Sequence, residues 1–395
     1  MVLNTPNKKG MMLRSFVVLT VMYYLANGTL AQGQVSTRSD QSSRPSPPAT
    51  ASKQVLIPNE AAVVELLSPL KPLQKVHYSW PLPNSMLEQP DGRLLREYVR
   101  LSHAVTISGE WCIQQHVVAA VQACKRENAE TPSIPASLAL CFKPWHRRFG
   151  KELPVTDCGP SHQAELVFFQ ERITTIRDWL AAANKEFGAR IEVTALLFDS
   201  ERLYARPNDA EWNKAITQKY DAFYDIGKRV FPNARIEWYG RGIQRTAHSS
   251  GWSSYGWNTF DNKADSFSCS LYRVAETDTM RESFRRTVEL AKKSGKEDVT
   301  PWVALGSGYK PHARKFQEWT SDWDYDLIHS WTIGAEINDP RYGAEPERYA
   351  PWNAAKVVVF YPQPFDPRTP SWAKHFVAYV RGANGIEALP KGNSK

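Results

Sequence analysis

The strongest constraint on the fold is a regular alternation of short apolar, β-branched runs with long helical patterns. Eight strand-like runs follow one another: Val76–Trp80, Tyr98–Thr106, Ser137–Phe142, Ile191–Phe198, Arg235–Tyr239, Ser266–Tyr272, Trp302–Gly306 and Lys356–Tyr361. Helical patterns lie among them at Gly109–Asn128, Ala164–Phe187, Ala210–Val230, Glu276–Lys293, Trp323–Ile337 and Pro370–Val380. Strands that alternate with helices form parallel sheets, and eight such units predict an α/β fold of the (β/α)8, or TIM, barrel type with elaborated loops. An open, doubly wound sheet is the alternative.

The first 54 residues differ in character from the rest. Lys8, Lys9 and Arg14 precede an apolar run, Phe16–Ala26, that is too short to span a bilayer, and small residues follow at Thr29-Leu-Ala31. This pattern predicts a signal peptide over residues 1–31, with an uncleaved anchor as the alternative. Residues 32–54 are rich in Ser, Thr, Gln and Pro, which predicts a disordered linker. We therefore expect one barrel domain over residues 55–395 of a protein that is secreted or periplasmic.

The distribution of charge argues against two classes of partner. The formal net charge is +8, and removal of residues 1–31, which hold three basic residues and no acid, lowers it to +5. This excess is spread along the chain without a run of Lys or Arg. We therefore expect no nucleic-acid partner, and no stable membrane insertion after the signal is removed.

The cysteines and glycines give no sign of a cofactor. Five cysteines leave at least one thiol without a partner in the same chain. Cys112 and Cys124 would lie about 18 Å apart along one helix and cannot bridge, whereas Cys141 and Cys158 flank one loop and can pair. Zinc-type Cys/His spacing is absent, and no Gly-rich phosphate loop follows a strand. We expect neither a metal nor another cofactor.

The stretch Arg190–Leu203 ends in an acidic pair, Asp199 and Glu201. Side chains alternate along a strand, so one face is expected to carry Val193, Ala195, Leu197, Asp199 and Glu201, and the other Thr194, Leu196, Phe198 and Ser200. Barrel active sites lie at the carboxyl ends of the strands, which is where this pair falls. Neighbouring carboxylates raise one another's pKa, so one of them can serve as a general acid. Salt bridging or helix capping is the structural alternative.

Aromatic and polar side chains follow many of the proposed strands. Flat rings with a polar edge suit the apolar faces of sugars, while charged and amide groups supply directed hydrogen bonds. The loop His248–Trp257 is especially rich in such residues. The residues we expect to bind a polysaccharide or oligosaccharide are Trp80, Trp145, Tyr204, Glu237, Trp238, Arg241, Trp252, Trp257, Tyr309 and Tyr361. Packing of these rings beneath long loops is the alternative.

The segment Leu196-Leu-Phe-Asp-Ser-Glu201 resembles the fourth-strand signature of chitinase-type and hyaluronidase-type glycoside hydrolases, which ends in Asp-x-Glu. The longer chitinase pattern has a further acid where this chain has Ala195. The resemblance implies that Glu201 protonates the glycosidic oxygen and that Asp199 orients a substrate N-acetyl group, whose carbonyl oxygen attacks the anomeric carbon. It also implies a catalytic tyrosine nearby, for which Tyr239 is the candidate. The function expected is a glycosidase of carbohydrate metabolism.

Other residues compete for a catalytic role, and other functions compete with hydrolysis. Glu110 follows the second predicted strand and is expected to begin a helix, where the helix dipole would stabilise its charge. Glu336 and Asp366 are further acids, and His77 and His146 fall at strand ends. A carbohydrate-binding barrel without catalysis is the main alternative, because a fold does not fix function. An esterase is disfavoured, since the Gly-x-Ser-x-Gly elbow is missing.

Overall fold

A computed structural model describes thirteen segments of the chain, all within the compact unit Gln54–Lys395. They are residues 60–88, 92–143, 164–199, 209–239, 244–245, 252–253, 262–270, 277–296, 298–305, 307–310, 315–318, 355–361 and 370–384. The proposed signal peptide and linker lie outside them, as does the helix expected at Trp323–Ile337. Export and the boundary near residue 55 therefore stay predictions.

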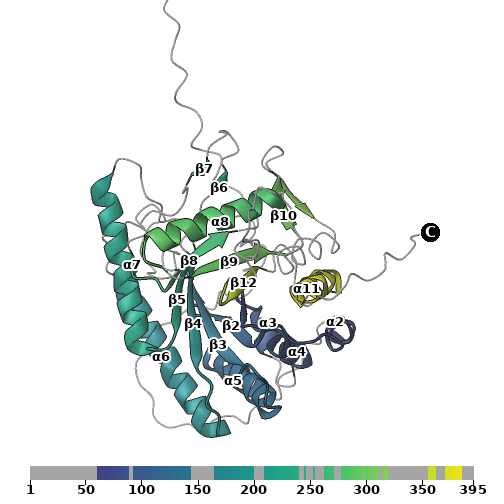
Figure 1. Cartoon of the computed structure of the whole chain (residues 1–395). Coiled ribbons are helices and arrows are strands. Elements are labelled where there is room, and N and C mark those ends of the chain that lie inside the picture. Colours follow the sequence, from purple (N-terminus) through teal and green to yellow (C-terminus); the bar gives the residue numbers. More distant parts are fainter. Residues whose placement is uncertain are drawn as a thin grey trace, which may run out of the picture. The chain divides into compact units, whose positions relative to one another are not determined.

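Eight parallel strands form a nearly closed barrel (Figure 1). They are β1 (His77–Ser79), β2 (Ala104–Ser108), β3 (Ser137–Phe142), β4 (Val193–Asp199), β5 (Arg235–Tyr239), β8 (Ser266–Ser270), β9 (Val299–Ala304) and β12 (Val358–Tyr361). Their order in the sheet is β1-β12-β9-β8-β5-β4-β3-β2. The remaining gap lies between β1 and β2, where the Ser79 amide donates to Thr106 Oγ1 at 3.2 Å and the Leu82 amide donates to the Thr106 carbonyl at 3.0 Å. The predicted (β/α)8 barrel is confirmed.

Helices cover the outside of the sheet. They are α2 (Glu60–Leu67), α3 (Asn84–Leu87), α4 (Arg93–Ser102), α5 (Gln114–Ala129), α6 (Ala164–Phe187), α7 (Ala210–Val230), α8 (Thr277–Lys293) and α11 (Pro370–Ala383). Helices α5, α6 and α7 pack side by side in chain order, as expected when each helix returns the chain to the next parallel strand (Figure 1). Two short antiparallel pairs, β6 (Gln244–Arg245) with β7 (Trp252–Ser253) and β10 (Ser307–Lys310) with β11 (Lys315–Glu318), lie outside the barrel sheet.

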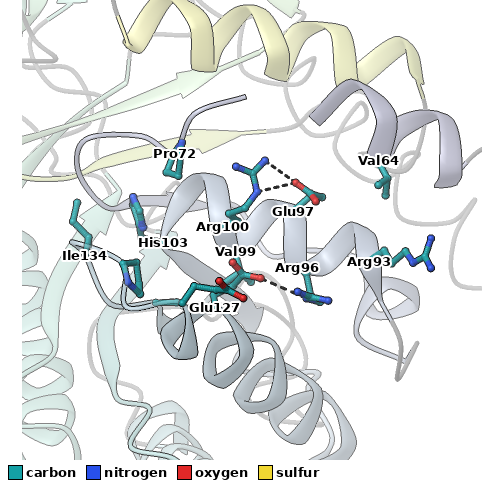
Figure 2. Close-up of a pocket in the computed structure, with 13 residues that line it drawn as sticks. Val64, Pro72, Arg93, Arg96, Glu97, Val99, Arg100, His103, Glu127 and Ile134 are labelled. Carbon is teal, nitrogen blue, oxygen red and sulfur yellow. Dashed lines mark hydrogen bonds and ion pairs between the residues drawn. The ribbon is translucent and has the colours of Figure 1, made fainter. Parts of the chain in front are cut away.

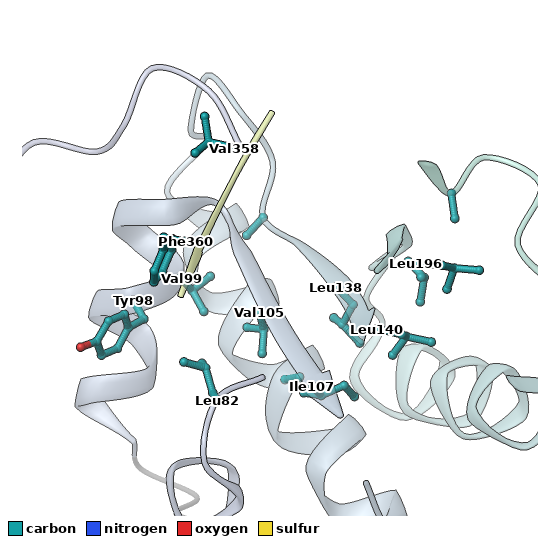
Figure 3. Packing of buried hydrophobic residues seen from close by; sticks show 14 of the residues in the cluster. Leu82, Tyr98, Val99, Val105, Ile107, Leu138, Leu140, Leu196, Val358 and Phe360 are labelled. Carbon is teal, nitrogen blue, oxygen red and sulfur yellow. The ribbon is translucent and has the colours of Figure 1, made fainter. Parts of the chain in front are cut away.

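The core has two layers, one on each side of the strands. The larger layer, between strands and helices, includes Val105, Leu138, Leu140, Leu196 and Phe360 (Figure 3). The second layer fills the barrel interior and consists of Tyr78, Ala104, Ala139, Cys141, Ala195, Leu197, Tyr239, Trp302, Val357 and Val359. Strands buried on both faces explain the near-continuous apolar runs of the sequence.

One predicted strand was wrong over half its length. The run Tyr98–Thr106 contains the end of α4 and the start of β2, and the two elements meet at His103. His103 ends the helix with φ 60°, the left-handed conformation, and its amide donates to the Val99 carbonyl at 2.8 Å. Glycine usually fills this position, so the sequence lacks the common stop signal and the apolar run reads as continuous.

Candidate active site at the carboxyl ends of strands β2, β3 and β4

The alternation predicted for the fourth strand holds at its end but not at its beginning. Leu196 and Phe198 pack against the helices, whereas Ala195 and Leu197 face the interior. The pairing with β3 shifts register at the start of the strand, where Leu138 pairs with Val193 and Ala139 with Ala195. This irregularity leaves Thr194 as an extra residue, so Val193 joins the helix-facing layer instead of the interior, as a β-bulge requires.

Asp199 ends β4 on the same inward face as Ala195 and Leu197, as predicted. It is 7% exposed. Its Oδ2 lies 3.1 Å from the Nζ of Lys143, which directly follows β3. Glu201, the predicted acid, lies outside the described residues.

Glu110 joins this group from the loop after β2. Its Oε1 accepts a short hydrogen bond from the Lys143 amide, and its Oε2 accepts one from Ser108 Oγ at 3.4 Å. Lys143 therefore holds two carboxyl groups at once, Glu110 through its backbone and Asp199 through its side chain. These three residues, Glu110, Lys143 and Asp199, form what we call the strand-end cluster.

Glu110 differs from the expected helix-capping acid. Helix α5 begins only at Gln114, so Glu110 does not lie in its first turn. The pKa of the Glu110 carboxyl is raised to about 7: burial is the main cause and the nearby Asp199 charge adds to it, while the Lys143 amide and ammonium and the Ser108 hydroxyl act in the opposite direction. A carboxyl that titrates near neutrality is suited to proton transfer.

The loop that carries Glu110 is tightly fixed. A Cβ atom on Gly109 would lie 2.2 Å from two ring atoms of the fully buried Phe142, so this close approach requires glycine. Arg172 of α6 donates through Nε to the Gly109 carbonyl at 2.8 Å and through its guanidinium to the Cys112 carbonyl. The position of Glu110 is thus set by the sheet and by a helix together.

Three aromatic rings line the same end of the barrel. Trp80, directly after β1, contacts Trp302 of β9 edge-on at a centroid distance of 6.0 Å, and Trp302 contacts Tyr239 at 4.7 Å. The Lys143 ammonium lies 4.9 Å from the centroid of the Trp80 ring. Tyr239 pairs in register with Asp199, and its catalytic role stays a prediction. Trp80 is partly exposed, so it is the ring of the three most open to a ligand.

Two predicted substrate-binding residues occupy enclosed positions. Glu237 is fully buried inside the barrel, where it accepts hydrogen bonds from Ser266 at 2.5 and 2.6 Å and from Thr300 at 2.9 Å and pairs with Arg235. Trp238 is fully buried on the helix side, stacked on Phe198 at a centroid distance of 4.4 Å. In this structure neither side chain can reach a sugar at the strand ends.

The remaining predicted site residues are only partly described or not described. The backbones of Trp252, Tyr309 and Tyr361 lie in β7, β10 and β12, and their side chains are not described. Outside the described residues lie Trp145, Tyr204, Arg241 and Trp257, and also Glu336, Asp366 and His146. Their predicted roles stay predictions.

His77 has a structural position. It is 1% exposed, and its Nδ1 shares a short hydrogen bond with the hydroxyl of Tyr379 on α11. Burial lowers the pKa of His77 well below its usual value, and the charge of Lys75 adds to that effect. A neutral, enclosed imidazole is not available for chemistry at the strand ends.

The described cysteines are Cys112, Cys124, Cys141 and Cys269, and all four are buried, free thiols. Cys158, the partner considered for Cys141, lies outside the described segments. Within those segments, no three His, Cys, Asp or Glu side chains gather as a metal ion would require. The same segments contain no helix with both the length and the apolar character needed to cross a bilayer.

A cavity of about 470 Å³ lies at the opposite end of the barrel, near the amino ends of β1, β2 and β3 (Figure 2). Its charged side chains are largely engaged with one another. Arg100 pairs with Glu97 at 2.7 Å and also donates to carbonyls at the end of α2, and Arg96 lies 3.5 Å from Glu127. These contacts join α2, α4 and α5, so we assign this cavity to the structural end of the barrel.

The protein is a (β/α)8 barrel, and acidic and aromatic side chains lie at its carboxyl edge. The sequence matches no protein-family model and no curated protein. The chain is similar in structure to an endo-1,4-β-mannanase from Rhizomucor miehei, with TM-score 0.47 and 10% identity over 80% of this chain and 96% of that one. It is also similar to a modular endo-β-1,4-mannanase from Cellulomonas fimi, with TM-score 0.45 and 12% identity over 83% and 76%.

A third similar structure is the GH5_18 protein from Streptomyces cattleya in complex with GlcNAc, with TM-score 0.43 and 10% identity over 81% of this chain and 83% of that one. The (β/α)8 fold of this chain is defined by its own strand pairing. The resemblance to the chitinase and hyaluronidase type stays a prediction from the sequence.

Proposed function

We propose that this chain is an exported glycoside hydrolase that cleaves a polysaccharide at the carboxyl edge of its barrel. The observation that carries the proposal is the strand-end cluster: Asp199 faces inward and lies against the Lys143 ammonium, and Glu110 accepts a hydrogen bond from the Lys143 amide. Aromatic rings with a polar edge lie at the same end, and such rings suit sugars. Two carboxyl groups in different electrostatic environments are the usual equipment for glycoside hydrolysis.

The roles follow from the sequence and from this electrostatic arrangement. Glu201 follows Asp199 by two residues and is the proposed acid that protonates the departing glycosidic oxygen. Asp199 assists as a negative charge near the anomeric carbon, where positive charge develops in the transition state. A substrate with N-acetylhexosamine units is the finer proposal, and it rests on the Asp-x-Glu resemblance. Tyr239 is proposed to contact the same sugar unit, and Trp80 to stack on a neighbouring one.

A carbohydrate-binding barrel without catalysis is the competing proposal. One observation favours it, because the ion pair with Lys143 and the low exposure of Asp199 are also what a purely structural carboxylate would have. Under this proposal the aromatic residues bind the glycan and the acids stabilise the barrel.

Glycan hydrolysis by the wild-type protein and by Glu201→Gln separates the two. We expect release of reducing ends by the wild type on at least one member of a broad polysaccharide panel, and loss of turnover with retained glycan binding in the variant. The matched control is Glu192→Gln, at the exposed amino end of the same strand, which should keep wild-type turnover. Binding without turnover by the wild type across the panel would favour the non-catalytic alternative.

A further inference from the structure

The cavity at the amino end of the barrel has the size of a small-molecule site. Its volume is about 470 Å³, and ligand pockets usually measure about 300–1,000 Å³. It is bounded by α2, α4, the end of α5 and the loop that leads to β3. Its apolar lining residues are Val64, Pro72, Val99, Pro132, Ile134 and Ala136. Pro72 and Ile134 lie at one end of the cavity, and Arg93 and Arg96 lie at the other (Figure 2). The cavity therefore has an apolar end and a charged end.

Some of the charged and polar groups that line the cavity are already satisfied by the protein. Arg100 donates two hydrogen bonds to Glu97, and the ring of His103 is hydrogen-bonded to a backbone carbonyl. Arg96 differs, because its Nε is buried and has no hydrogen-bond partner among the described residues. The ion pair of this Nε with Glu127 Oε1 is 3.5 Å long. Buried polar atoms normally have a partner at hydrogen-bond distance, so the Arg96 Nε is a donor that a bound group would satisfy.

Arginines of α4 and glutamates of α5 face the same cavity. Arg93 precedes Arg96 by three residues, so the two share a face of α4. Glu130 follows Glu127 by three residues at the end of α5. The side chains of Arg93 and Glu130 are exposed, and within the described segments neither makes a hydrogen bond or an ion pair. Glu127 is 8% exposed, and burial raises the pKa of its carboxyl. Three arginines and three glutamates line the cavity in total, so neither sign of charge is in excess.

We propose that the cavity binds a small zwitterion with an apolar side chain, of the α-amino acid class. Arg93 and Arg96 bind the carboxylate, because a guanidinium can donate two parallel hydrogen bonds to this group. Glu127 and Glu130 bind the ammonium, and the side chain of the ligand packs against the apolar lining residues. Because Arg96 and Glu127 lie side by side, they match two charges that are separated by a single carbon atom. A ligand with one charge would leave the groups of one wall without a partner. The proposal does not depend on glycan hydrolysis, since the strand-end cluster lies at the other end of the barrel.

Isothermal titration calorimetry of the full chain with leucine, methionine and phenylalanine tests the proposal. We expect one-site, saturable binding of at least one of them, with a Kd below about 1 mM. The amino acid that binds best is then compared with its deaminated acid and its decarboxylated amine, which are isocaproate and isoamylamine for leucine. Each should bind at least about 10-fold more weakly, because each lacks one charged partner. An acid or an amine that binds as tightly as the amino acid overturns the zwitterion, and absence of saturable binding by all three amino acids overturns the site.

Variants locate the binding in this cavity. Arg96→Gln and Glu127→Gln should each raise the Kd by about 10–100-fold, because each removes a charge-assisted hydrogen bond to the ligand. The matched control is Arg126→Gln, which changes an exposed residue of α5 outside the cavity lining and should keep the wild-type Kd. Thermal melting shows whether each variant is folded. The exposed residues Arg93 and Glu130 provide the same test without a change at a buried position, through Arg93→Gln and Glu130→Gln. A wild-type Kd in every folded variant of these four residues would overturn the assignment.

Discussion

At the scale of single residues, the structure replaces one expectation with a more specific one. Glu110 was expected at the start of a helix, where its pKa would fall. It lies instead at the end of a barrel strand, where burial raises its pKa to about 7. The sequence could not reveal this change, because it depends on the pairing of β2 with β3, which brings the Lys143 amide to the carboxyl group.

The raised pKa of Glu110 predicts a pH-dependent loss of stability. Its folded pKa, about 7, lies above the usual value of a glutamate, about 4.5, so the folded state binds more protons between these values. The free energy of unfolding therefore falls as the pH rises from about 4.5 to 7, by a contribution of about 1–3 kcal/mol from this group. Urea denaturation at pH 5 and pH 8 should show this fall in the wild type and a smaller one in Glu110→Gln.

The control for that measurement is Glu192→Gln, which removes an exposed carboxylate from the other end of β4. It should retain the wild-type difference between the two pH values. An equal pH dependence in the wild type and in Glu110→Gln would contradict the raised pKa.

At the scale of secondary-structure elements, the contact between α6 and α7 contains a buried ion pair. Glu165 of α6 pairs with Lys219 of α7, and both side chains are nearly inaccessible, with exposed fractions of 2% and 1%. A buried charge without a partner is strongly destabilising. Substitution of one residue of the pair therefore lowers the free energy of unfolding more than replacement of both residues by apolar ones.

The variant Lys219→Met should therefore lower the free energy of unfolding by about 3–5 kcal/mol, because it removes the cation from a buried carboxylate. The double variant Lys219→Met with Glu165→Met should recover most of that loss, as measured by urea denaturation. Lys263→Met, which breaks an exposed pair with Asp225, serves as the control and should barely move the midpoint. Equal destabilisation by the single and double variants would disprove the coupling.

The helices and strands could be predicted from the sequence where a local apolar periodicity determines them. The strands Ser137–Phe142 and Arg235–Tyr239 and the helices Ala164–Phe187 and Ala210–Val230 have the predicted bounds, since their apolar periodicity is strong. The end of α4 was missed because a histidine takes the left-handed position there. The bulge at Thr194 was missed because it arises from pairing with β3, and no property of the residue itself marks it.

At the scale of the whole molecule, closure of the barrel creates the site. Asp199 was predictable as a strand-end acid, but Lys143 and Trp302 were not chosen from the sequence. An isolated lysine after a strand has no diagnostic pattern, and only the barrel brings it to Asp199 and over the Trp80 ring. Trp302 meets Tyr239 and Trp80 because β9, β5 and β1 all face one interior. Residues in or directly after β1, β3, β4, β5 and β9 thus meet at the carboxyl edge of the barrel.

The most direct test of the central claim is a crystal structure of the protein with a bound oligosaccharide. The account predicts a sugar chain across the carboxyl edge of the barrel, with one unit near Trp80 and Asp199 and its glycosidic oxygen within about 3 Å of a Glu201 carboxyl oxygen. A sugar bound at the amino end, or one whose scissile oxygen lies far from Glu201, Asp199 and Glu110, would contradict it.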